Sequence, residues 1–170
     1  DATNDLEYFD TTSNRFINLN LNTNNIIYIY ETRNNKLIFS AQRDGVFELD
    51  LKSNRIKINS ITDIKDLVAY NLFEDKDEKL WISSEKTIYV LKKNSIGQYQ
   101  LVRTIQNFLV VKSFLTIDDS LMWMATKEGL YLMNYKTYRS KKYTTENNLP
   151  DNFLYSILKD DSGYYWLSSN

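Results

Sequence analysis

Short apolar runs separated by polar turns recur along the chain at a nearly constant interval. The stretches "KLIFSAQRDGVFELD" from Lys36, "KLWISSEKTIYVLK" from Lys79 and "LMWMATKEGLYLMN" from Leu121 align with one another. Their aromatic anchors, together with a fourth near the end of the chain, are Phe39, Trp81, Trp123 and Trp166, which lie 42, 42 and 43 residues apart. A second apolar run follows each of the first three anchors, beginning at Val46, Ile88 and Leu130, again 42 residues apart. The aromatic anchors and the starts of the second apolar runs therefore indicate the same internal repeat of about 42 residues.

Each repeat contains enough short runs for four strands. A run rich in branched and aromatic residues precedes each anchor, as in "IIYIY" from Ile26, and a polar turn such as "EDKDEK" joins the two. Each unit then ends in a looser alternating stretch, such as "RIKIN" from Arg55. Such short runs bounded by Asn, Asp, Ser and Gly are typical of strands and hairpins, and a propeller blade has four strands. The sequence therefore predicts an all-β protein, a β-propeller of four-stranded antiparallel blades.

The repeat also predicts how the blades divide the chain. We expect the outer half of a blade at 1–24, whole blades at 25–65, 66–108 and 109–150, and the inner half of a blade at 151–170. The first boundary depends on "ATNDLEYFD" from Ala2, which matches "ATKEGLYLMN" from Ala125 with one residue deleted. The chain is thus interpreted as a partial propeller, a fragment of a larger ring of about seven blades.

Composition and charge narrow the range of partners and chemistry. Aromatic residues make up 14% of the chain and there is one proline, which favours strands over helices. A formal net charge of −1 provides no basic field, so we expect neither nucleic acid nor a membrane surface as a partner of this segment. The absence of cysteine and histidine excludes disulfides, a Ser-His-Asp triad and imidazole metal ligands. No cofactor is expected.

Carboxylate pairs are the remaining candidates for catalysis or metal binding. They are Asp75 with Asp77, Asp118 with Asp119, and Asp160 with Asp161. Such pairs can serve a glycosidase or a calcium loop. They recur at the same predicted hairpin of successive blades, however, and aspartate favours turns because its side chain bonds nearby backbone amides. We therefore expect turn residues here, with no catalytic residue and no metal site.

The recurring aromatic anchors have two interpretations. Indole rings stack on sugar faces, so the three tryptophans are candidates for a glycan platform. Their equivalent positions instead favour a structural role, in which each large ring fills the gap between neighbouring sheets.

Ligand contacts are expected in loops at one end of the blades, because a rigid scaffold leaves loops free to vary. The candidates are Arg43, Lys86, Lys127 and Asn152. The three basic residues fall in corresponding turns of successive blades, where they would form a positive arc suited to sulfated or uronic-acid sugars. Ordinary solvated turn charges explain the same pattern, and both interpretations stay open.

The last stretch resembles a known repeat. "YTTENNLPDNFLYSILKDDSGYYWLSSN", from Tyr143 to Asn170, is similar to the two-component regulator propeller repeat, whose usual form is Leu-Pro, Asn, a strand ending in Asp, a Gly-containing turn and Leu-Trp-Ile-Gly-Thr. The matching positions are Leu149, Pro150, Asn152, Asp160, Gly163 and Trp166. Ser168, and Ser83 and Ala125 in the earlier copies, replace the glycine that the family usually has after its tryptophan. The resemblance extends over the whole chain in four copies.

The resemblance implies a sensor. In this family such repeats form the periplasmic sensor region of hybrid two-component proteins, which join a membrane-anchored histidine kinase to a response regulator, mostly in Bacteroidetes. It implies sensing of glycan-derived oligosaccharides, control of transcription of polysaccharide-utilisation genes, and no catalysis by this segment. We also expect self-association through propeller faces or open blade edges. The alternatives are a propeller-fold polysaccharide lyase or glycosidase, and a non-catalytic protein–protein scaffold.

Overall fold

The described part of the chain consists almost entirely of antiparallel strands. The computed structural model describes residues 6–21, 23, 25–50, 57–64 and 67–170. Its strands are β1 (Glu7–Asp10), β2 (Arg15–Asn18), β3 (Ile26–Glu31), β4 (Leu37–Ala41), β5 (Gly45–Asp50), β6 (Lys57–Ser60), β7 (Asn71–Glu74), β8 (Lys79–Ser83), β9 (Thr87–Lys93), β10 (Tyr99–Gln106), β11 (Val111–Thr116), β12 (Leu121–Thr126), β13 (Gly129–Asn134), β14 (Arg139–Tyr143), β15 (Leu154–Lys159) and β16 (Tyr165–Ser169). A short 3-10 helix, η2, covers Thr145–Asn147.

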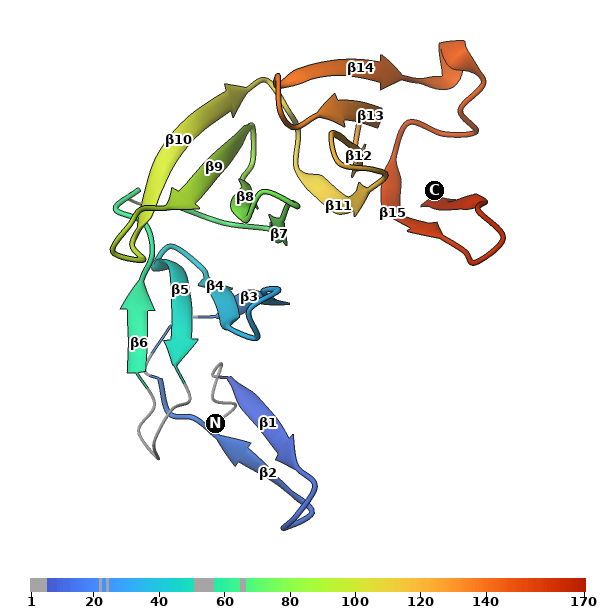
Figure 1. Cartoon of the computed structure of the whole chain (residues 1–170). Helices are drawn as coiled ribbons and strands as arrows, with labels where there is room; N and C mark the ends of the chain where they lie inside the picture. The colour runs from blue at the N-terminus through green and yellow to red at the C-terminus, as the bar shows by residue number, and fades with distance from the viewer. Residues whose placement is uncertain (1–5, 22, 24, 51–56, 65–66) are drawn as a thin grey trace.

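The strands form five sheets that follow one another around an open arc (Figure 1). Three sheets have four strands in sequence order, β3 to β6, β7 to β10 and β11 to β14, and the pairs β1–β2 and β15–β16 form two-stranded sheets. The first strand of each of the last four sheets, namely β3, β7, β11 and β15, lies on the concave side of the arc in Figure 1, whereas β6, β10 and β14 lie on the convex side. This is the blade arrangement of a β-propeller, and the predicted fold class is confirmed.

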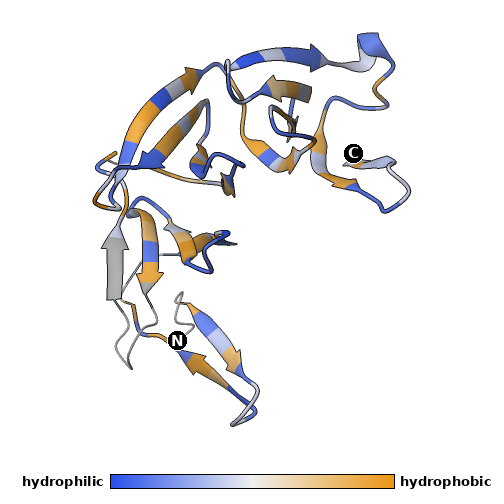
Figure 2. Ribbon diagram, in the orientation of Figure 1, coloured by the Kyte–Doolittle hydropathy of each residue, from blue (hydrophilic) through white to orange (hydrophobic). Residues whose placement is uncertain are grey.

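Apolar side chains fill the seams between neighbouring sheets, which is how blades stabilise one another. The seam between the β7–β10 and β11–β14 sheets contains Trp81, Val90, Met122, Met124 and Met133, all fully buried. A second cluster lies between the β3–β6 and β7–β10 sheets, and smaller ones lie at the two ends of the arc. Figure 2 shows the complementary distribution, with hydrophilic residues prevailing on the outer strand β14 and in the hairpin turns.

The strand registers correct one of the four predicted anchors. Trp81 and Trp123 both pack toward the sheet that follows their own. In the β3–β6 sheet the residue that does so is Ile38, whereas Phe39 packs on the opposite face, against Leu6 of the preceding half-blade and its neighbours. Phe39 is buried, but it does not occupy the tryptophan position.

The error has a simple cause in the turn between the second and third strands of that blade. The pair Ala41 and Gly45 closes a turn of three residues, whereas the pair Thr126 and Gly129 closes a turn of two. When the repeats are aligned on the strand that follows this turn, the strand that precedes it is therefore shifted by one residue. A displacement by one residue moves a strand side chain to the other face of the sheet.

Stability is expected to be constant across neutral pH and to fall in acid. With no histidine, no side chain has an ordinary pKa near neutrality. Hydrogen bonding to Lys136 holds the pKa of Asp77 below its usual range, and the backbone N–H groups of Ser120 and Leu121 do the same for Asp118. Such carboxylates stabilise the fold above the unfolded pKa of about 4, and this contribution is lost as pH falls through the depressed folded value.

The corresponding measurement is the Tm by circular dichroism as a function of pH. We expect one plateau from about pH 5 to 9 and a decline below about pH 4. At the alkaline end, burial raises the pKa of Tyr30, so its contribution is lost above about pH 10, where unfolded tyrosine ionises. A transition between pH 6 and 8 would contradict this assignment.

Candidate functional site

The first aspartate of two hairpins is fully used in local bonding. Asp75 Oδ1 accepts hydrogen bonds from the backbone N–H groups of Asp77 (2.8 Å) and Lys79 (3.0 Å), and its Oδ2 accepts one from Trp81 Nε1 at 2.8 Å. Asp160 repeats the arrangement, with Tyr164 N at 2.9 Å and Trp166 Nε1 at 2.7 Å. The indole bond is the main reason that the pKa of Asp160 is lowered. These two carboxylates shape the turn and hold the indole.

The hairpin between β11 and β12 lacks this pairing. Ile117 stands where the other two hairpins have the aspartate, and Asp118 bonds the turn instead through Ser120 N (2.7 Å) and Leu121 N (2.8 Å). Trp123 Nε1 is buried and has no hydrogen-bond partner among the described residues. The Trp123 ring packs edge-on against two tyrosines, Tyr143 at 5.7 Å and Tyr165 at 6.1 Å.

The second aspartate of two hairpins joins neighbouring blades through ion pairs. Lys136, in the turn after β13, bonds Asp77, and Lys76 bonds Asp119 with an N–O distance of 2.6 Å. Within the described residues no cluster of three or more acidic side chains suited to a metal ion is present. The hairpin carboxylates therefore serve turns, indoles and seams, which is the structural interpretation of these pairs.

The tryptophans do not form a shared surface. Trp81 is completely buried, Trp123 is partly buried and Trp166 is 61% exposed on the terminal half-blade. The two inner ones fill seams between sheets, so their rings are not available to stack on a sugar.

The predicted ligand residues lie in turns between the second and third strands of their blades. Arg43, Lys86 and Lys127 are all exposed. Each has an acidic neighbour in the same turn, namely Asp44, Glu85 and Glu128. The structure therefore presents alternating charges here and not a uniformly positive arc.

Asn152 has an internal role. Its side-chain Oδ1 accepts a hydrogen bond from Thr145 N at 2.8 Å, which holds the 3-10 turn of the connection from β14 to β15. This bond explains an asparagine at this position without a ligand.

Sequence analysis missed a set of residues on the innermost strands. β-Bulges leave one residue in each of three inner strands outside the regular pairing, namely Ile27 in β3, Lys112 in β11 and Tyr155 in β15. In the β7–β10 sheet, Tyr70 precedes β7 at the corresponding place and is 38% exposed. Bulges often turn a side chain out of the sheet at a functional site. The four residues share no side-chain type, so the sequence gives no common signal for them, and the bulges become visible only in the strand pairing.

Four residues come together where β15 meets the turn between β12 and β13, and we call them the corner cluster: Lys127, Phe153, Tyr155 and Asn170. Lys127 Nζ lies 5.5 Å from the centre of the Phe153 ring. The Phe153 and Tyr155 ring centres are 4.9 Å apart with planes inclined at 51°. The Tyr155 hydroxyl donates a hydrogen bond to Asn170 Oδ1 at 3.0 Å, and the Tyr155 side chain is 48% exposed. An exposed and a half-buried aromatic ring beside a cation are chemically suited to bind a polar ring with an anionic group.

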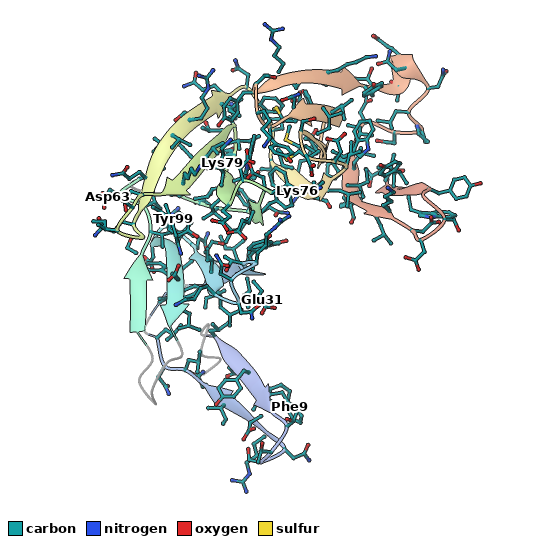
Figure 3. All side chains as sticks on the ribbon, in the orientation of Figure 1. Phe9, Glu31, Asp63, Lys76, Lys79 and Tyr99 are labelled. Atoms are coloured by element: carbon teal, nitrogen blue, oxygen red, sulfur yellow. The ribbon has the colours of Figure 1, made fainter. Side chains whose placement is uncertain are left out.

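A separate groove of about 1150 Å³ lies on the convex side, between the outer parts of two blades. It is bordered by 60–64 and by 97–101, and Figure 3 shows Asp63 and Tyr99 on this side of the arc. Glu48 in its wall pairs with Lys93 at 2.8 Å, and the Lys93 ammonium lies 4.6 Å from the Tyr99 ring centre. Glu48 and Tyr99 in this groove therefore both already interact with Lys93, the first through an ion pair and the second through a cation–π contact.

The chain shares its fold with the extracellular domain of a bacterial signalling system. It superimposes on two structures of the extracellular domain of BT4673 from B. thetaiotaomicron, described as a one-component and as a hybrid two-component system. The TM-scores are 0.77 and 0.74, at 20% and 18% identity, over 97% of this chain and 24% of those chains. PorZ, a surface component of the type-IX secretion system of Porphyromonas gingivalis, gives 0.72 at 16% identity over 94% of this chain and 27% of its own.

These similarities define the class of protein. The chain is a β-propeller segment that spans about a quarter of the length of these structures. The resemblance to two-component regulator propeller repeats is thereby confirmed at the level of the fold. No protein-family model and no curated protein sequence matches the chain. No helix in the described part has the length and apolar composition of a membrane span.

The same fold also occurs in an enzyme. Virginiamycin B lyase from Staphylococcus aureus gives a TM-score of 0.71 at 11% identity, over 98% of this chain and 56% of its own. Fold alone therefore does not decide between sensing and catalysis, and the residues of the site have to do so.

Proposed function

We propose that the chain is an extracytoplasmic, ligand-sensing propeller segment of a hybrid two-component protein, a sensor histidine kinase joined to a response regulator. The observation that carries the proposal is the fold that 97% of the chain shares with the BT4673 extracellular domain. The segment belongs to the periplasmic part of an inner-membrane protein. It contributes no phosphorylated histidine, because it has none.

The ligand is an oligosaccharide derived from a complex glycan, and its binding controls transcription of polysaccharide-utilisation genes. The exposed Tyr70 and Tyr155 and the half-buried Phe153, near the concave side, support this ligand class, since aromatic rings pack against the apolar faces of sugars. A ligand bound there changes how the propeller packs against a second propeller or a second receptor copy, and so biases the kinase.

The segment acts without catalysis. Asp75 and Asp160 are bonded to indoles and turn amides, Asp77 and Asp119 are paired with lysines, and no histidine is available as a base. A lyase or glycosidase needs a carboxylate or another base that faces its substrate. The fold that virginiamycin B lyase shares keeps the enzyme as the alternative to be tested.

Calorimetric titration of the 170-residue chain with a panel of neutral and acidic plant and host oligosaccharides tests this function. We expect saturable binding of one class, and chromatography of the same mixtures after prolonged incubation should return the sugars intact. Cleavage of any sugar would establish the enzyme in place of the sensor. Absence of binding throughout the panel would contradict glycan sensing.

A further inference from the structure

We propose that the corner cluster is a binding site for an acidic oligosaccharide, one that carries uronic-acid carboxylates or sulfate groups. Lys127 binds the anionic group, and the rings of Tyr155 and Phe153 receive the face of a sugar ring. This inference rests on the proposed sensing function and adds to it a location and a chemical class of ligand.

The aromatic half of the site is held in place before a ligand arrives. Tyr155 is the bulge residue of β15, and its hydroxyl is fixed by Asn170 at 3.0 Å. Phe153 directly precedes β15, its ring centre lies 4.9 Å from that of Tyr155, and its backbone N–H donates to Asp151 Oδ1 at 2.6 Å. A ring that is anchored at its polar end and 48% exposed offers an apolar surface at little entropic cost.

Lys127 supplies the positive charge of the site, and this charge is not paired with a carboxylate of the described residues. Lys127 makes no ion pair among the described residues, and its contact is with the Phe153 ring. The neighbouring Glu128 is engaged elsewhere, because it bonds Lys142 at 3.1 Å and the hydroxyl of Tyr131 at 2.9 Å. An ammonium beside an aromatic ring retains its attraction for an anion, and a hydrogen bond between two ions is stronger than one between neutral groups.

The other two basic turns lack the aromatic half. Neither Arg43 nor Lys86 lies over an aromatic ring in the part of the chain that the structure describes. At the place that corresponds to Phe153, two residues before the bulge residue Lys112, the following blade has the buried Val110, which carries no aromatic ring. Lys86 is therefore a matched control for Lys127, with the same charge and the same turn one blade earlier.

The experiment compares tetragalacturonic acid with its carboxyl-reduced counterpart, a neutral tetrasaccharide of galactose, by calorimetry on the wild-type chain, Lys127→Gln, Lys86→Gln and Tyr155→Ala. We expect the acidic sugar to bind the wild-type chain and the Lys86→Gln variant alike. Its Kd should rise about tenfold or more in Lys127→Gln, because a charge-assisted hydrogen bond is lost, and it should also rise in Tyr155→Ala. Sulfated galactose oligomers in a parallel titration separate sulfate from carboxylate recognition.

Three outcomes would overturn the assignment in distinguishable ways. Equal affinity for the acidic and the neutral tetrasaccharide would remove the acidic class but leave glycan sensing intact. Unchanged affinity in Lys127→Gln and Tyr155→Ala would place the sugar elsewhere on the chain and also leave sensing intact. Absence of binding by any acidic or neutral sugar, with all variants folded by circular dichroism, would reject this site and the sensing function together.

Discussion

Trp81→Ala is expected to lower the free energy of unfolding by about 3–5 kcal/mol. Its side chain is fully buried in the seam between the β7–β10 and β11–β14 sheets, and its ring centre lies 5.9 Å from that of Tyr138 in the next blade. The substitution leaves a cavity between two blades and removes the indole donor from the buried carboxylate of Asp75. Urea denaturation followed by far-UV circular dichroism measures the loss.

Trp166→Ala is the matched control, because the repeat places the same side chain in a different environment. Trp166 makes the same hydrogen bond, to Asp160 Oδ2, but is 61% exposed and fills no seam with a following sheet among the described residues. Its replacement should cost less than about 1 kcal/mol. Equal losses in the two variants would show that the anchor does not act through the seam.

Asp75→Ala is expected to cost about 3 kcal/mol, since it removes a fully buried carboxylate that accepts three hydrogen bonds. The N–H groups of Asp77 and Lys79 and the indole N–H of Trp81 then lose their partner away from water. Asp75→Asn should lose less, because the amide oxygen can still accept from the two backbone groups. Urea denaturation of the three proteins gives the order wild type, Asn, Ala.

Asp160→Ala is the matched control for Asp75→Ala, because Asp160 makes the same kinds of hydrogen bond in an exposed hairpin. The hairpin has the same bonds to a backbone amide and an indole, but they are exposed to water, which replaces the lost acceptor. The expected loss is clearly smaller than that of Asp75→Ala, measured by the same urea denaturation. A cost as large as that of Asp75→Ala would indicate that the turn geometry, and not the buried seam, carries the stability.

The repeat allowed much of the fold to be predicted from the sequence, because a blade is a local unit whose strands pair in chain order. The polar hairpins and the seam role of Trp81 and Trp123 agree with that prediction. The exchange of Ile38 and Phe39 could not be foreseen, since both are apolar and adjacent and only the length of the β4–β5 turn distinguishes their faces.

Less of the candidate site than of the fold could be predicted from the sequence. Lys127 was identified by its place in the repeat, but Phe153 and Tyr155 were read as part of a strand, because a bulge is a property of strand pairing and not of composition. The uniform positive arc that Arg43, Lys86 and Lys127 suggested does not arise, since each turn also carries an acid. What distinguishes Lys127 from the other two is a neighbour from the next blade, which depends on how two blades pack.

The most direct measurement is a map of backbone amide chemical shifts of the isotope-labelled chain during titration with tetragalacturonic acid. We expect the shifts to be confined to the turn between β12 and β13, the start of β15 and the end of β16, with the sugar unchanged at the end of the titration. Shifts centred on 60–64 and 97–101, at the groove on the convex side, or the release of shorter sugars, would contradict a non-catalytic sensor that binds its ligand at the corner cluster.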